Sequence, residues 1–305
     1  MKALICGGAG FVGQHLAQRL ESEGHSYRIY DKVMPHQGGG VCADIQDVEL
    51  LTSYMRGSDI VFHLASNADI AKAATDPTID FIEGTQLTQK ILEAMRLSGV
   101  KRLVYFSGSG VYGESATTVF REDHGPLMPI SPYGASKLAS EAMICAYCHM
   151  FGIEARVMRP ANIVGPRQTH GVGYDFLRRL RDDPTRLRVL GDGFQTKSYV
   201  HIYDVLDAVW LLLNNPNPPR YSVFNVATQD GITVRDIASM AVGVMGIKGC
   251  EIQFGTDDRG WNGDVPRISF DCTRLHNLGW RPTCNSAEAV MMSLVAMHQS
   301  YENLP

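Results

Sequence analysis

The sequence has no long hydrophobic run. No stretch of its 305 residues approaches the roughly 20 consecutive apolar residues of a membrane-spanning helix. Met1 leads directly into an apolar strand-like segment, without the pattern of a secretory signal peptide. We therefore expect no membrane partner and a cytoplasmic location.

The sequence also has no excess of positive charge. Its formal net charge is −4, whereas a nucleic-acid-binding surface depends on many Lys and Arg side chains. The one basic cluster, Arg178 to Arg188, is interpreted as a solvated helix face and loop. No nucleic-acid partner is predicted.

Cysteines are few, and their spacing does not match a disulfide framework. Their number is seven, which is odd, and they are scattered along a large chain, which is typical of free thiols in a reducing compartment. Cys145 and Cys148 form a CxxC pair within a helix-like stretch, but no second ligand pair lies near them in the sequence. We predict packing roles for them and no metal site.

A glycine-rich turn stands near the start of the chain. Gly7, Gly10 and Gly13 follow the apolar strand Ala3–Cys6 and precede the helical apolar pattern of Gln14–Leu20. In a strand–turn–helix unit, glycines permit a tight turn and let backbone N–H groups approach a pyrophosphate at the helix N-terminus. This spacing predicts a dinucleotide-binding loop.

An acidic residue ends the next predicted strand, Arg28–Asp31. Asp31 lies roughly 20 residues past the glycine loop, where a carboxylate accepts the ribose hydroxyls of an adenosine. It would repel a 2′-phosphate, so NAD is predicted over NADP, a preference that Lys32 weakens slightly. Asp44 is interpreted either as a contact of the adenine edge or as a surface residue near a helix N-cap.

Strand and helix patterns alternate through the first half of the chain. Alternation of this kind predicts right-handed βαβ units and an α/β fold, a Rossmann-like doubly wound parallel sheet with a smaller α/β C-terminal domain. Ligands bind such sheets beyond the carboxyl ends of the strands. That rim is predicted to carry 7–13, 64–66 and 107–113.

The amino-acid composition changes after Arg167, where a long polar, Arg-rich segment begins. A helix is predicted at 199–214 and a strand at 222–227, followed by amphipathic helices at 233–244 and 286–298. We predict an NAD-binding Rossmann domain of 1–165 plus 198–227. Residues 166–197 plus 228–305 are predicted to form a second, smaller domain.

A tyrosine and a lysine are spaced for one helix face. Tyr133 and Lys137 are four residues apart at the start of the predicted helix 133–151. A free Tyr has a pKa of roughly 10, and a nearby lysine cation together with a nicotinamide cation favours the phenolate. The pair therefore predicts a general base, Tyr133, with Lys137 lowering its pKa and binding the nicotinamide ribose.

With these motifs the chain resembles an extended short-chain dehydrogenase/reductase, and it is similar to the nucleotide-sugar epimerases typified by UDP-glucose 4-epimerase. The resemblance extends over nearly the whole chain. The motifs that carry it are GGAGFVG at 7–13, Asp31, Asp44-Ile45, HLA at 63–65, VYG at 111–113, SPYGASK at 131–137, RPANIVGPR at 159–167 and GDGFQTKSYVH at 191–201.

The resemblance implies an NAD-dependent nucleotide-sugar 4-epimerase that oxidises C4, lets the 4-keto sugar rotate and returns the hydride to its other face. A UDP-sugar is the implied substrate and a homodimer the implied assembly. The implied cofactor contacts are Gly7, Gly10, Phe11, Val12, Gly13, Asp31, Lys32, Asp44, Ile45, Leu64, Ala65, Ser66, Ser107, Tyr133, Lys137, Pro160 and Ile163. The implied substrate contacts are Gly108, Ser109, Asn162, Val189, Lys197, Arg259 and Asp264.

One position departs from the family pattern. Relatives carry Ser or Thr three residues before the Val of the VYG motif, and this chain has Gly108 there, flanked by Ser107 and Ser109. We predict Ser109 as the third catalytic residue, presented by the flexible segment; a water in its place, or a changed reaction, are the alternatives.

The same segment separates the alternative reactions. Related 4,6-dehydratases carry Thr-Asp-Glu where this chain has Gly108-Ser109-Gly110, so the acid for elimination is missing. A 4-keto-sugar reductase would need the same residues as an epimerase, and Asp31 argues against it weakly because net reductases usually prefer NADPH. An inactive NAD-binding protein also stays open, although intact Tyr133 and Lys137 argue against it.

Overall fold

The structure is a computed structural model of the chain and describes residues 1–35, 39–67, 72–73, 75–115, 119–215 and 219–302. It divides into two compact units. Unit 1 comprises Met1–Tyr112, Pro126–Arg159 and Leu206–Phe224. Unit 2 comprises Gly113–Gly125, Pro160–Val205 and Asn225–Pro305.

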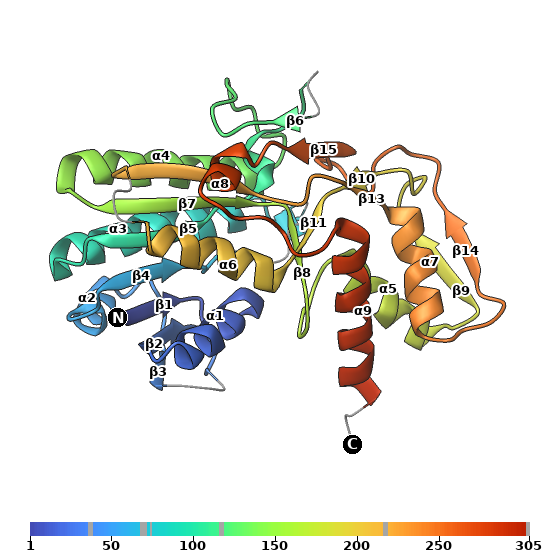
Figure 1. Cartoon of the computed structure of the whole chain (residues 1–305), viewed down its shortest axis with the longest axis horizontal. Coiled ribbons are helices and arrows are strands. Elements are labelled where there is room, and N and C mark those ends of the chain that lie inside the picture. The colour runs from blue at the N-terminus through green and yellow to red at the C-terminus, as the bar shows by residue number, and fades with distance from the viewer. Residues whose placement is uncertain (36–38, 68–71, 74, 116–118, 216–218, 303–305) are drawn as a thin grey trace. The chain divides into compact units, whose positions relative to one another are not determined.

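Unit 1 is built on a seven-stranded sheet with the order β12-β7-β5-β4-β1-β2-β3 (Figure 1). The pairings from β3 through β2, β1, β4 and β5 to β7 are all parallel. This arrangement confirms the predicted Rossmann-like α/β fold. The strands are β1 (Lys2–Cys6), β2 (Ser26–Asp31), β3 (Gly39–Cys42), β4 (Ile60–His63), β5 (Arg102–Phe106), β7 (Glu154–Pro160) and β12 (Tyr221–Val226).

The central strands are buried on both faces, as their continuous apolar runs predict. All four residues of β4 are buried. Leu4 and Cys6 face a core formed with three helices, α2 (Val48–Met55), α3 (Leu87–Ser98) and α4 (Pro132–Phe151). Ala3 and Ile5 point the other way and are equally buried.

The opposite face of the sheet carries α1 (Phe11–Ser22) and α6 (Ile202–Leu213), which lie in front of it in Figure 1. The Arg19 guanidinium of α1 lies 5.3 Å from the centre of the Trp210 ring of α6, so the two helices are neighbours. Short helices complete the unit, a π-helix η2 (Phe81–Gln86) and a 3₁₀-helix η3 (Ser109–Val111).

Unit 2 contains shorter strands around its own apolar core. β6 (Val119–Phe120), β10 (Thr196–Lys197), β13 (Ile232–Thr233) and β15 (Arg267–Phe270) form a four-stranded sheet. Two further pairs are β8 (Asn162–Val164) with β11 (Tyr199–His201), and β9 (Arg186–Val189) with β14 (Glu251–Phe254). The helices are α5 (Val172–Asp182), α7 (Val234–Val244), α8 (Thr273–Asn277) and α9 (Ser286–Glu302).

The structure corrects one predicted element. The helix predicted from Tyr199 begins only at Ile202, because Tyr199–His201 pairs with β8 as the strand β11. A helical apolar pattern runs through this strand without a break, so the sequence could not mark the boundary. The Arg-rich segment after Arg167, interpreted as loop and solvated helix face, holds α5 and the strand β9.

The compact units also differ from the predicted domain boundaries. Residues 113–125 and 160–165 fall in unit 2, as do 198–205. The reason is pairing with distant strands: Val119 and Phe120 pair with β15, and β8 pairs with β11. Among the described residues, no helix is both long enough and apolar enough to cross a membrane.

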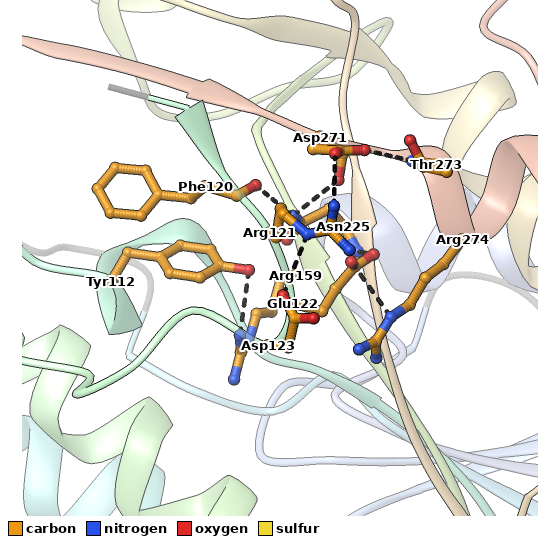
Figure 2. Close-up of polar contacts among 10 residues, drawn as sticks. All are labelled: Tyr112, Phe120, Arg121, Glu122, Asp123, Arg159, Asn225, Asp271, Thr273 and Arg274. Atoms are coloured by element: carbon orange, nitrogen blue, oxygen red, sulfur yellow. Dashed lines mark hydrogen bonds and ion pairs between the residues drawn. The ribbon is translucent and has the colours of Figure 1, made fainter. Parts of the chain in front are cut away.

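Hydrogen bonds of Asn225 link three segments of unit 2. Its side-chain Nδ2 donates to the carbonyl oxygens of Phe120 at 2.9 Å and Asp271 at 3.1 Å, and its backbone N–H donates to Glu122 (Figure 2). Asn225 is completely buried. Glu122 also forms an ion pair with Arg274 of α8 at 3.4 Å, so α8 is linked to the same group of residues.

We expect Asn225→Ala to lower the free energy of unfolding by about 2–4 kcal/mol, because two buried carbonyl oxygens lose their donor and each costs about 1–3 kcal/mol when unsatisfied. Urea denaturation followed by circular dichroism measures this. Asp123→Ala is the control; it removes only an exposed ion pair with Arg121 and should change stability by less than about 1 kcal/mol. Equal losses in the two variants would contradict the assignment.

Candidate active site

The glycine loop between β1 and α1 is packed backbone against backbone. Gly7 has a positive φ of 86°, and a Cβ there would lie 2.5 Å from the backbone nitrogen of Ala65. A Cβ on Gly13 would lie 2.5 Å from the Cα of Gly8. Gly10 is the N-cap of α1 and provides no side-chain cap. The first N–H groups of the helix therefore remain available to an anion, as a pyrophosphate requires.

Asp31 stands at the end of β2, beside this loop. Its Oδ2 accepts a hydrogen bond from the Ala9 N–H at 2.8 Å, and its Oδ1 accepts one from the Val33 N–H at 3.0 Å. Each carboxylate oxygen keeps a further lone pair for ribose hydroxyls. The glycine cradle and this carboxylate fit the adenosine diphosphate portion of NAD. Lys32 beside it forms an ion pair with Glu83 at 2.7 Å.

The rim segment after β4 lies directly against the glycine loop. The N–H groups of Leu64 and Ala65 both donate to the carbonyl oxygen of Cys6. Further along the rim, Asp44 is exposed and accepts the Gln46 N–H at 2.9 Å, whereas Ile45 is buried in the core of unit 1. The N-cap of α2 is Asp47, so Asp44 is an exposed residue near a helix N-cap, as its second interpretation has it.

The start of α4 is fixed by its cap and by a close approach. The Ser131 hydroxyl accepts the Gly134 N–H at 3.1 Å, and Pro132 occupies the first turn. A Cβ on Gly134 would lie 2.4 Å from the carbonyl oxygen of Gly110, so α4 touches the segment that follows β5. Tyr133 and Lys137 therefore lie beside residues 107–110.

Lys137 is buried and points back to the end of β5. Its Nζ donates to the Phe106 carbonyl oxygen at 2.8 Å and lies 5.5 Å from the centre of the Tyr133 ring. Burial lowers the pKa of Lys137 to about 8, while the Glu141 and Asp80 carboxylates act in the opposite direction. Lys137 is therefore still mainly a cation at neutral pH, although it is held at a desolvation cost.

Tyr133 is not activated by the protein alone. Burial raises the pKa of Tyr133 to about 12, a hydrogen bond with the Ser66 hydroxyl acts against this, and the Asp80 charge adds to the rise. The expectation that Lys137 together with a nicotinamide cation lowers the pKa of Tyr133 stays a prediction. The cost of desolvating the phenolate raises the pKa more than the Lys137 cation lowers it, and a further positive charge nearby would reduce this difference.

A buried ion pair braces the same face of α4. Glu141 lies four residues beyond Lys137 and is bound by Arg159 of β7 through Nε at 2.9 Å and Nη2 at 2.6 Å. The Ser107 hydroxyl donates to Glu141 at 2.5 Å. Arg159 also donates to the Tyr112 hydroxyl at 3.0 Å (Figure 2). Because both charged side chains are less than 5 % exposed, this brace fixes the two ends of the 107–112 segment to α4.

The predicted triad is only partly assembled. Gly108 has extended backbone, and a Cβ there would be 3.9 Å from the Tyr133 hydroxyl oxygen, which is ordinary van der Waals distance. The Ser107 hydroxyl donates its hydrogen bond to Glu141. Ser109 begins η3 and is half-buried; among the contacts of the described residues, its hydroxyl makes no hydrogen bond to Tyr133. Ser109 as the third catalytic residue stays a prediction.

Unit 2 gathers three of the predicted substrate contacts. Lys197 of β10 forms an ion pair with Asp264, and Arg259 donates to the Asp264 carbonyl oxygen at 2.8 Å. Arg259 also pairs with Glu114 at 2.7 Å. The Gly260 N–H donates to the Asp264 carboxylate at 3.1 Å. Two cations and their counter-charges are thus held in one cluster, and their contact with a substrate stays a prediction.

The other predicted residues of unit 2 lie on its strands. Asn162 begins β8, is exposed and approaches the Ser198 carbonyl oxygen at 3.4 Å, while Pro160 is buried and Ile163 is half-buried. The Val189 side chain is in the core of unit 2, and its contact with a substrate stays a prediction.

Sequence reasoning missed several supporting residues. Glu141 continues the Tyr133–Lys137 spacing by four residues, which could have revealed it. Arg159 and Glu114 come from distant segments, and nothing local indicates their pairing. Gln195 is also notable: it is 2 % exposed and neither polar atom of its side chain has a hydrogen-bond partner. Among the described residues, no group of three His, Cys, Asp or Glu side chains is placed to hold a metal ion.

We expect Gly13→Ala to weaken NAD binding more than tenfold, because the new methyl group would enter the backbone of Gly8 and displace the loop. Isothermal titration with NAD⁺ measures the affinity. Gly243→Ala in α7 is the control: a Cβ there meets nothing within 4 Å, so it should bind NAD normally and be equally or more stable. Unchanged affinity in Gly13→Ala would remove the loop from the cofactor site.

Glu141→Gln should lower the free energy of unfolding by about 3–5 kcal/mol, since it leaves the Arg159 charge buried without a counter-charge. Glu93→Gln is the matched control. Glu93 binds Arg96 through two hydrogen bonds on the exposed surface of α3, and its loss should cost less than about 1 kcal/mol. Guanidinium denaturation of both variants makes the comparison, and a cost for Glu141→Gln as small as that of the control would contradict a bracing role.

Comparison with known proteins agrees with this geometry. The model of the "NAD dependent epimerase/dehydratase family" matches residues 3–227. The UDP-glucose 4-epimerase of Mycolicibacterium smegmatis is 31% identical over 309 residues, covering 95% of this chain and 96% of that protein.

Solved structures agree as well. A crystal structure of a UDP-galactose 4-epimerase has a TM-score of 0.89 and 32% identity, with 100% of both chains covered. The UDP-glucose 4-epimerase of Thermus thermophilus in complex with NAD has a TM-score of 0.85 and 29% identity, covering 97% of this chain and 98% of that one.

The match over residues 3–227, together with the glycine cradle, Asp31 and the Tyr133–Lys137 pair, shows that NAD is the cofactor and that the chain belongs to the NAD-dependent epimerase/dehydratase family of nucleotide-sugar enzymes, within the extended short-chain dehydrogenase/reductases.

Proposed function

We propose that this chain is an NAD-dependent nucleotide-sugar 4-epimerase that acts on a UDP-hexose through a transient 4-keto sugar. The observation that carries the proposal is that Tyr133 and Lys137 lie beside a 107–110 segment that contains no carboxylate. Proton exchange at one hydroxyl is then possible, whereas an elimination would lack its acid. The 4-epimerase names of the similar proteins support the same reaction.

Proton movement is assigned to Tyr133. The phenolate accepts the proton of the sugar 4-hydroxyl in the first half of the reaction and returns it in the second. Bound NAD supplies a hydride acceptor and, with its nicotinamide cation, positive charge near the phenol. The Lys137 cation adds to that charge from the other side, because Glu141 and Asp80 help to keep it protonated.

Binding of the cofactor is assigned to unit 1. The glycine loop and Asp31 hold the adenosine diphosphate, and the rim residues Leu64 to Ser66 together with Ser107 border the dinucleotide. Pro160 and Ile163 are the further cofactor contacts that the resemblance implies.

Binding of the nucleotide sugar is assigned mainly to the cluster in unit 2. Lys197 and Arg259 are the cations for the diphosphate, and Asp264 is the acid for the ribose of the nucleotide. In the chain alone these cations are neutralised by Asp264 and Glu114, so an arriving diphosphate competes with carboxylates that are already in place. Asn162 is the further contact proposed for the diphosphate.

We also propose a homodimer formed through α3 and α4. Both helices expose large apolar side chains near their C-terminal ends, namely Leu97, Met150 and Phe151. Exposed apolar groups of this kind favour a protein–protein contact.

The decisive experiment is proton NMR in D₂O with a panel of UDP-sugars, with and without added NAD⁺. We expect a C4 epimer without solvent deuterium, and Tyr133→Phe should lose about 10²–10⁴-fold in rate because the proton acceptor is gone. Tyr27→Phe is the control: it removes a phenol at the opposite end of the sheet, at the start of β2, and should keep wild-type activity.

Other products would overturn the proposal. Deuterium at C5 with a 4-keto-6-deoxy product would identify a dehydratase. Reduction of a 4-keto sugar at the expense of added NADH would identify a reductase. No turnover of any sugar by a folded protein that binds NAD would favour an inactive NAD-binding protein.

A further inference from the structure

Lys32 carries a positive charge directly beside the acid assigned to the adenosine ribose. It follows Asp31, the last residue of β2, whose Oδ2 accepts the Ala9 N–H of the glycine loop at 2.8 Å. The 2′-hydroxyl of that ribose is the position at which NADP carries its additional phosphate, and a cation near the end of this strand favours such a phosphate. Lys32 is therefore a residue whose charge would favour NADP.

The Lys32 ammonium is already paired. Its Nζ donates to Glu83 Oε1 at 2.7 Å, across 51 positions of the chain. Glu83 lies in η2, within the connection from β4 to α3, and both residues belong to unit 1. The positive charge that a 2′-phosphate would need is thus neutralised by a carboxylate of the chain itself.

The strand order places this ion pair at the cofactor edge of the sheet. β2 and β4 both pair in parallel with β1, one on each side, so their carboxyl ends flank the glycine loop that follows β1. Lys32 follows β2, and η2 belongs to the connection that leaves β4. The pair therefore joins the segments on the two sides of the loop, at the edge where a dinucleotide binds.

Glu83 is presented by an element that is packed against α4. The next residue is Gly84, where a Cβ would collide with the Ser136 hydroxyl of α4. The Thr85 and Ser136 hydroxyls are 3.0 Å apart, and the Gly84 carbonyl oxygen accepts the Thr88 hydroxyl at 2.9 Å. The Glu83 backbone is therefore fixed on both the helix side and the α4 side of η2.

We propose that Glu83 is a coenzyme-specificity residue that disfavours NADP by neutralising Lys32 at the end of β2. To bind a 2′-phosphate, Lys32 would have to leave Glu83, and the phosphate would then lie near two carboxylates, those of Asp31 and Glu83. An exposed ion pair contributes little to stability, so the expected effect is on the choice of ligand and not on folding. The inference concerns the cofactor alone and does not depend on the sugar that the chain converts.

Isothermal titration of the nucleotide-free protein with NADP⁺ and with NAD⁺ tests the inference, with competition between the two for the weaker ligand. Glu83→Gln should bind NADP⁺ about five- to tenfold more tightly than the wild type, because Lys32 is released to the 2′-phosphate. Its affinity for NAD⁺ should change less than about twofold, since NAD has no charge at that position.

Two further variants isolate the cause. Glu93→Gln is the matched control: it removes the same charge from the exposed surface of α3, where Glu93 binds Arg96, and should change neither affinity. In a Lys32→Ala background, Glu83→Gln should raise NADP⁺ affinity by less than about twofold, because the cation that it releases is absent. The gain in the single variant should also shrink at high salt, which screens exposed charges.

Two results would overturn the inference. One is a Glu83→Gln protein that binds NADP⁺ no more tightly than the wild type does. The other is an equal gain with and without Lys32, which would mean that Glu83 does not act through this lysine. Since the titrations use no sugar, a protein that discriminates between the coenzymes as expected but epimerises nothing would support the role of Glu83 while rejecting the proposed reaction.

Discussion

The buried pair of Glu141 and Arg159 is the interaction on which the arrangement of the site depends. It joins α4 to β7, and through Ser107 and Tyr112 it also holds both ends of the segment that follows β5. Desolvating two charges is costly, and the cost is offset here because every contact is a charge-assisted hydrogen bond with suitable geometry. Tyr133, Lys137 and Glu141 recur at intervals of four residues, so the brace and the reactive pair share one face of the helix. Whatever fixes Glu141 therefore also fixes the base.

Burial acts on the two reactive residues in opposite senses. It lowers the pKa of Lys137, so the ammonium loses its proton more readily. It raises the pKa of Tyr133, which disfavours the phenolate. Without bound NAD, these pKa shifts favour a neutral Tyr133 phenol beside a Lys137 cation. The positive charge of a bound nicotinamide would act against the rise in the pKa of Tyr133.

Unit 2 uses a different electrostatic arrangement. Lys197 and Arg259 are partly exposed and are paired with carboxylates before any ligand arrives. Ion pairs of this kind hold both cations in defined positions. In the proposed site, Lys197 would offer a diphosphate a point charge and Arg259 a bidentate fork.

The sequence by itself determined the sheet and the cofactor, and it predicted Tyr133 and Lys137 on one face of a helix. These features are local: a buried parallel strand is a continuous apolar run, the glycine spacing places a loop before a helix, and a Tyr–Lys interval of four residues fixes a common helix face. It also predicted Lys197, Arg259 and Asp264 as a group, through resemblance to relatives. The boundary at Ile202 was missed because β11 and α6 share one uninterrupted apolar pattern.

Only the tertiary structure decided which partners meet across long separations. Arg159 contacts Glu141, and Asn225 contacts Phe120 and Asp271, although no spacing in the chain links these residues. The direction of the Tyr133 pKa shift was decided in the same way, because burial depends on everything packed around the side chain. Hydrogen bonds and desolvation are properties of the folded surroundings, and residue order along the chain encodes them only through the fold.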